Sequence, residues 1–168
     1  MSPFKLLLVD DSPNILKALV RTLKPEGYLT FGAESAQKAM EILEIEKVDL
    51  IITDENMPGL TGTELLRVVR ERYPDIIRFM ITGANDIEVA KNAINQGEIY
   101  RFFTKPWDDF ELIVSVRYAL QHKITERENK QLKSIIKGQE ELLCELEEEH
   151  PGITERRLAQ DGSIIIDG

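Results

Sequence analysis

The 168-residue sequence contains a single cysteine, Cys144, so no disulfide bond can form within the chain. It has no signal-peptide core and no apolar run long enough to cross a membrane. Its basic residues form no block, and a formal charge of −9 argues against a general nucleic-acid-binding surface. We therefore expect a cytoplasmic protein whose chain contacts neither nucleic acid nor a membrane.

The remaining composition is ordinary for a globular protein, with 42% hydrophobic and 30% charged residues. Short apolar runs alternate with segments in which apolar residues recur at helical spacing. The runs cover residues 4–9, 28–33, 49–53, 76–81 and 99–103. Because these runs are apolar throughout rather than alternating, they predict a parallel sheet covered by helices on both faces. The expected fold class is α/β with five βα units.

Several of the expected helices begin with capping signatures. Thr61 precedes Glu64 by three residues, which predicts a capping box, and Asn85 with Glu88 repeats the pattern. We expect a helix to begin directly after Thr61 and another directly after Asn85.

Polar residues follow four of the five apolar runs. Asp10 and Asp11 come after the first run, Asp54 after the third, Thr82 after the fourth and Lys105 after the fifth. The carboxyl ends of parallel strands meet at one edge of a sheet, where ligands gather. Clustered carboxylates repel one another, and a hard cation such as Mg²⁺ would compensate them. A carboxylate beside Mg²⁺ can attack phosphorus, while a nearby ammonium neutralises the developing charge.

Taken together, these motifs resemble the receiver domain of two-component response regulators. The resemblance covers about residues 3–123 and rests on the runs Leu6–Asp11, Asp54–Gly59, Thr82–Ala84 and Lys105–Pro106. It implies a flavodoxin-like (βα)5, doubly wound, five-stranded parallel sheet. It also implies reversible phosphorylation by a histidine kinase or phosphotransfer protein. No enzymatic activity is expected beyond accepting and hydrolysing the chain's own aspartyl phosphate.

The resemblance assigns a phosphoacceptor and a metal site. Asp54 corresponds to the phosphoacceptor. The side chains of Asp11 and Asp54 and the main-chain carbonyl of Asn56 correspond to Mg²⁺ ligands, and Asp10 would assist through a bound water. Mg²⁺ is the only cofactor implied.

The resemblance also assigns the residues that would sense the phosphoryl group. Lys105 would pair with that group, and its peptide bond to Pro106 is expected to be cis. Thr82 corresponds to the switch hydroxyl and Phe102 to the switch aromatic, although an ordinary core position is an equal alternative for Phe102. The neighbouring Phe103 alternates to the other face of the strand and is expected to be core.

Two functions in different classes fit this reading. The first is a phosphorylation-controlled switch whose output is protein–protein interaction or dimerisation. The alternative is the N-terminal regulatory part of a longer signalling enzyme, such as a cyclic-nucleotide phosphodiesterase or cyclase. A haloacid-dehalogenase-like phosphatase is disfavoured, because Asp10-Asp11-Ser12 does not supply the Asp-x-Asp motif of its nucleophile.

Residues 124–150 extend past the expected receiver, residues 1–123, without a proline. Leu132, Ile135, Leu142 and Leu146 recur at steps that fit a short coiled coil, with Gln139 at the intervening seam position. The pattern favours a helix that dimerises with a second copy. A solvated helical linker and packing against another partner helix are the alternatives.

The tail, residues 151–168, changes character after a Pro-Gly pair. Residues 156–166 are typical of a two-stranded β-hairpin, with Asp161-Gly162 as a type I′ turn.

Overall fold

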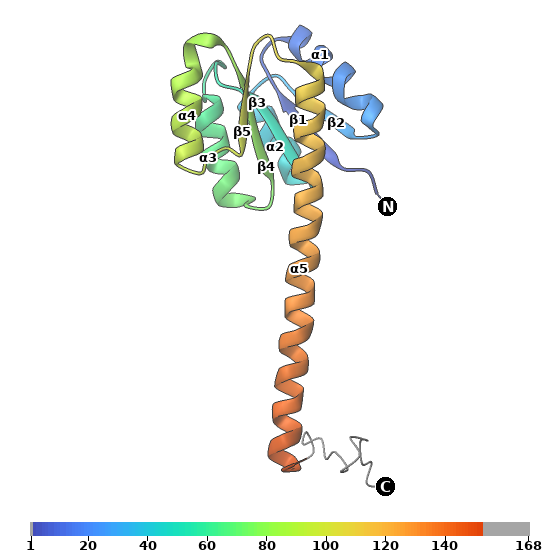
Figure 1. The fold of residues 1–168 in the computed structure, drawn as a ribbon. Coiled ribbons are helices and arrows are strands. Elements are labelled where there is room, and N and C mark those ends of the chain that lie inside the picture. The colour runs from blue at the N-terminus through green and yellow to red at the C-terminus, as the bar shows by residue number, and fades with distance from the viewer. Residues whose placement is uncertain (1, 153–168) are drawn as a thin grey trace. The chain divides into compact units, whose positions relative to one another are not determined.

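The computed structural model describes residues 2–152. A five-stranded parallel sheet with the order β2-β1-β3-β4-β5 forms its centre (Figure 1). The strands are β1 (Lys5–Val9), β2 (Leu29–Ala33), β3 (Leu50–Asp54), β4 (Ile77–Thr82) and β5 (Arg101–Thr104). The alternating pattern predicted the parallel sheet, and the resemblance to receiver domains implied this flavodoxin-like arrangement. β1 and β3 pair in the middle of the sheet, which accounts for their continuous apolar sequences.

Helices cover both faces of this sheet (Figure 1). The helices are α1 (Pro13–Leu23), α2 (Ala36–Ile45), α3 (Gly62–Arg72), α4 (Ile87–Asn95) and α5 (Asp109–Glu149), with short 3-10 helices at Lys24–Glu26 (η1) and Ala84–Asp86 (η2). On one face, α2, α3 and α4 pack against alternate strand residues such as Leu7 and Ile51. On the other, α1 and the first part of α5 pack against residues such as Leu6 and Phe79.

Of the two helix caps predicted from the sequence, at Thr61 and at Asn85, the structure contains the first. The capping box at Thr61 is confirmed, because its side chain accepts from the Glu64 backbone N–H and the Glu64 carboxylate accepts from the Thr61 N–H. The cap expected at Asn85 is wrong. Asn85 lies within η2, and α4 begins at Ile87 with Asp86 in the N-cap position. A turn of 3-10 helix therefore separates β4 from α4, which the Asn-x-x-Glu spacing alone cannot distinguish from a cap.

The chain divides into two compact units, Met1–His122 and Lys123–Gly168. Residues 109–122 of α5 belong to the first unit and residues 123–149 to the second. No helix within residues 2–152 combines the length and apolarity that crossing a membrane requires. The hairpin predicted for residues 156–166 lies outside the described residues.

Candidate functional site

Three carboxylates meet at the edge of the sheet where the strands end. Asp10 directly follows β1, Asp11 is next to it, and Asp54 is the last residue of β3. A carboxylate oxygen from each lies within 4.8 Å of the others. Asp10 is 2% exposed and Asp54 is 6% exposed, whereas Asp11 faces solvent. We call these three residues the acidic cluster.

Lys105 supplies a positive charge to this cluster. Its Nζ lies 2.8 Å from Oδ2 of Asp10 and 3.3 Å from Oδ1 of Asp54. The backbone holds Lys105 in place, since its N–H donates to the Thr82 carbonyl at 2.8 Å. The cis peptide bond predicted between Lys105 and Pro106 is confirmed. One ammonium thus serves two buried carboxylates located at the ends of different strands.

The pKa values of these groups are perturbed by burial and by one another. Burial raises the pKa of the Asp54 carboxyl; the charge of Lys105 opposes this shift, and the charge of Asp10 adds to it. Burial works against the charge of the Lys105 ammonium, but the hydrogen bonds and charges of Asp10 and Asp54 outweigh it and raise its pKa. Asp54 is therefore a buried base whose charge is only partly compensated by this chain.

Backbone contacts fix the orientation of Asp10. The N–H of Ser12 donates to Oδ1 of Asp10 at 2.8 Å, so one carboxylate oxygen faces the start of α1 and the other faces Lys105. The Asp10 N–H donates to the Ala33 carbonyl at 3.1 Å, which continues the β1–β2 pairing past the end of β1. The side chain of Asp10 is thus held from both sides.

Thr82 and Phe102 lie on the two strands beyond Asp54. Thr82 is fully buried, and its Oγ1 has no hydrogen-bond partner among the described residues. Phe102 is partly buried and packs against the core beneath α2, α3 and α4. Phe103 is 5% exposed in the opposite core, which confirms its expected place on the other face of β5.

Asn56 lies on the exposed loop that follows Asp54. Its side-chain amide donates to the Asp86 carboxylate in η2, so this contact joins the loop after β3 to the segment after β4. Sequence reasoning missed Asp86, because a bond between residues 30 positions apart leaves no local signal.

Two further contacts that shape the site were also missed, one made by Gly62 and one made by Glu55. A Cβ placed on Gly62 would lie 2.1 Å from the carbonyl oxygen of Asp54, so only glycine fits there. The buried Glu55 carboxylate accepts hydrogen bonds from the backbone N–H and the hydroxyl of Thr63, at 2.8 and 2.7 Å. The start of α3 is therefore packed directly against the backbone that carries Asp54. A glycine directly after a helix cap was the only sequence signal for this contact.

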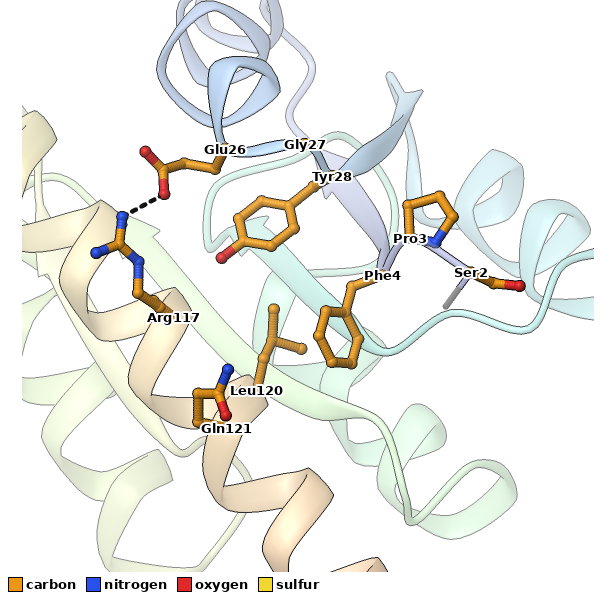
Figure 2. Close-up of a pocket in the computed structure, with 9 residues that line it drawn as sticks. All are labelled: Ser2, Pro3, Phe4, Glu26, Gly27, Tyr28, Arg117, Leu120 and Gln121. Atoms are coloured by element: carbon orange, nitrogen blue, oxygen red, sulfur yellow. Dashed lines mark hydrogen bonds and ion pairs between the residues drawn. The ribbon is translucent and has the colours of Figure 1, made fainter.

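A separate hollow of about 460 Å³ lies at the opposite edge of the sheet, near the starts of β1 and β2 (Figure 2). Arg117 of α5 donates to Glu26 across its rim. Burial, followed by the charge of Glu26, raises the pKa of the Tyr28 hydroxyl. The two charged side chains that line the hollow neutralise each other, so the candidate for phosphoryl chemistry is the acidic cluster.

Comparison with known proteins identifies the group to which this arrangement belongs. The model of the response regulator receiver domain matches residues 6–117, more than half of the chain. The chain belongs to the response regulator receiver family. The receiver reading of the motifs is thereby confirmed.

Curated receiver proteins align with the chain over much of its length. The hydrogenase transcriptional regulatory protein HoxA of Cupriavidus necator is 41% identical over 115 residues, covering 68% of this chain and 24% of that protein. The transcriptional regulatory protein GlrR of Escherichia coli K12 is 33% identical over 167 residues, covering 99% of this chain and 36% of that protein. The chain thus spans about a quarter to a third of the length of these relatives. Because both are named as transcriptional regulators, the alternative of a signalling-enzyme receiver is not favoured.

Solved receiver structures share the fold. The signal receiver domain of an HD domain-containing protein from Pseudomonas fluorescens Pf-5 has a TM-score of 0.71 and 39% identity, covering 76% of this chain and 94% of that one. NtrX from Brucella abortus has a TM-score of 0.73 and 30% identity, covering 78% of this chain and 30% of that one.

Proposed function

We propose that Asp54 accepts a phosphoryl group from the phosphohistidine of a histidine kinase or phosphotransfer protein in the cytoplasm. One observation carries the proposal: Asp54 is buried within reach of two other carboxylates and one ammonium. An Asp54 carboxylate oxygen would form a bond to phosphorus while the phosphorus–nitrogen bond of the donor breaks. The electron pair of that bond goes to the imidazole nitrogen. The raised pKa of Asp54 supports its role as the nucleophile, because a more basic carboxylate attacks phosphorus more readily.

The donor set of the acidic cluster fits Mg²⁺. The side chains of Asp11 and Asp54 and the main-chain carbonyl of Asn56 would hold the ion, and Asp10 would act through a bound water. Hard oxygen donors of this kind suit Mg²⁺, and a single ammonium leaves the carboxylates incompletely neutralised. When bound, the ion would withdraw charge from the oxygens of the transferring phosphoryl group. The contact of Asp10 with the Ser12 N–H supports a fixed orientation of the cluster before any ion arrives.

Lys105 would position the phosphoryl group and stabilise its charge. Its Nζ lies closest to Asp10 and slightly farther from Asp54, so it can turn towards an oxygen on Asp54 without leaving Asp10. A preorganised ammonium in a largely buried site stabilises charge more strongly than it would in water. No reaction beyond formation and hydrolysis of the chain's own aspartyl phosphate is included in the proposal.

The switch would act through Thr82 and Phe102. The buried Thr82 hydroxyl, which no atom of residues 2–152 pairs with, would donate to the new phosphoryl group and draw the end of β4 towards it. Phe102, which is only partly buried, would follow into the space released beneath α4. The contacts made by the phosphoryl group then favour one of two arrangements of the surface formed by α4, β5 and the first part of α5.

The output would be protein–protein interaction, including self-association through residues 124–150 as a homodimer. The segment carries the apolar side chains expected of a short coiled coil, and five of them are more than half exposed: Leu132, Ile135, Ile136, Leu142 and Leu143. Exposed apolar residues at helical spacing support a helical partner for this segment.

Labelling with a small phosphodonor, acetyl phosphate, tests the proposal. In the presence of Mg²⁺ we expect an acid-stable, base-labile adduct on the wild-type chain and none on Asp54→Ala. The matched control is Asp75→Asn, which removes an exposed carboxylate elsewhere and leaves labelling unchanged. Chelation of divalent metal is expected to stop labelling. Equal labelling of Asp54→Ala and wild type would refute the site, and labelling that persists in chelator would refute the metal.

A further inference from the structure

We propose that residues 123–149 pair with the same segment of a second copy in the antiparallel direction. The inference rests on the proposed self-association and adds its orientation. Both orientations would cover the same apolar surface, and the distribution of charge along the helix distinguishes them.

The surface to be covered is a single apolar stripe. At 3.6 residues per turn, its members fall on one side of the helix. They are Leu132, Ile135, Ile136, Gln139, Leu142, Leu143 and Leu146. The exposed hydrophobic members are between 51% and 57% exposed, so much of the stripe faces solvent in a single copy. We refer to these residues as the stripe.

The two halves of the segment carry opposite charge. Residues 123–137 contain five basic and two acidic residues, whereas residues 138–149 contain six acidic residues and no basic one. In a parallel pair the acidic halves would lie side by side and repel each other. In an antiparallel pair each basic half would lie against an acidic half. The segregation of charge therefore favours the antiparallel orientation.

The residues that border the stripe follow the same rule. By helical geometry Lys133 borders it in the first half, and four glutamates border it in the second: Glu140, Glu145, Glu147 and Glu149. Bordering side chains lie closest to a partner helix, so their charges contribute most to the choice of orientation. A pair centred near residue 138 would bring Lys133 of one copy near Glu145 of the other.

Gly138 supplies independent support, because nothing in the described part of a single copy requires a glycine there. A Cβ placed there meets no atom within 4 Å, and its φ is not in the left-handed region. A glycine inside a helix costs about 1 kcal/mol relative to alanine. It borders the stripe at the point where the charge changes sign, and glycine allows two backbones to approach closely. A second helix crossing at this position accounts for it.

Neutral variants give opposite results for the two orientations, as measured by sedimentation equilibrium of the full chain. For an antiparallel pair, the triple variant Glu140→Gln, Glu145→Gln and Glu149→Gln removes attraction, and we expect the dissociation constant to rise about tenfold. Lys133→Gln is expected to raise it as well, by a smaller factor. For a parallel pair both changes relieve repulsion and would lower it. The matched control, Glu34→Gln with Glu41→Gln and Glu44→Gln, makes the same charge change on exposed residues of the first unit.

A distance measurement tests the orientation directly. In a Cys144→Ser background, Gln131→Cys carries a nitroxide label on the border of the stripe without changing charge. In an antiparallel pair centred on Gly138, the two labels would be separated by about 20 Å along the helix axis. In a parallel pair, only the spacing between the helices, about 10 Å, separates their attachment points.

Any of three results would overturn the inference. They are tighter association of the glutamine variants, labels separated only by the spacing between the helices, and no self-association of the wild type. The acetyl phosphate assay is read on Asp54 and does not depend on association. Its failure would therefore remove the phosphorylation proposal while the pairing result stood on its own measurement.

Discussion

Replacing Gly62 with alanine would test how tightly the phosphoacceptor backbone is fixed. The new methyl carbon would lie 2.1 Å from the carbonyl oxygen of Asp54, 2.9 Å from its carbonyl carbon and 3.0 Å from Cα of Glu55. All three are backbone atoms, so no side chain can rotate away. Ordinary contact begins at 3.4 Å, so α3 and the end of β3 would have to separate by more than 1 Å.

We expect Gly62→Ala to lower both the stability of the first unit and the rate of phosphorylation. Overpacking a well-filled site costs about 1–3 kcal/mol, and the absence of any flexible neighbour favours the upper end. For a unit of this size, such a loss lowers the melting temperature by about 10 °C. The rate should fall further, because a displacement of about 1 Å in a reacting group can cost on the order of 100-fold. Phosphorylation of Gly62→Ala should therefore be impaired even where the variant is fully folded.

Thermal unfolding measures the loss of stability, and the initial rate of labelling by acetyl phosphate measures the loss of phosphorylation rate. Labelling is carried out at a temperature where circular dichroism shows that the chain is folded. Gly32→Ala is the matched control, because its nearest neighbour would be a Leu16 methyl at an ordinary 3.8 Å. It should change neither quantity appreciably. If Gly62→Ala matched Gly32→Ala in both, the conclusion that α3 fixes the Asp54 backbone would be wrong.

Two further predictions concern the charges of the site. Because burial raises the pKa of Asp54 above its ordinary 3.8, the folded chain keeps this proton to higher pH than the unfolded chain does. The free energy of unfolding should therefore fall as pH rises from 3.8 through the raised pKa. For the same reason Asp54→Asn should be more stable than the wild type at pH 7. Urea titrations at pH 7 that show a less stable Asp54→Asn would contradict this. Lys105→Met should cost about 3 kcal/mol, because it leaves Asp10 and Asp54 buried together without a counter-charge. Combining it with Asp54→Asn should recover part of that loss, and strictly additive effects in this double-mutant cycle would show that the two residues do not interact.

Much of the fold and of the polar groups at the sheet edge could be predicted from local sequence. An apolar run that ends in a polar residue marks both a buried strand and the position of a side chain at its carboxyl end. Asp10, Asp54, Thr82 and Lys105 were located in this way, and the topology of the sheet brings three of them together.

The features that sequence could not supply depend on distances between segments. The need for glycine at residue 62 arises from the position of the Asp54 carbonyl, eight residues earlier in the chain. The contact of Asn56 with Asp86 depends on how two loops approach each other, and the cap expected at Asn85 was displaced by a turn of 3-10 helix. Periodicity reports which side of an element is apolar, but it carries no information on how closely two backbones meet.

The Thr82 hydroxyl, which has no hydrogen-bond partner among the described residues, affects how much free energy a change of conformation requires. An acceptor that reaches Oγ1 gains a hydrogen bond without breaking one that already exists. Residues 2–152 offer no acceptor to this hydroxyl, so the switch has no existing hydrogen bond of theirs to break.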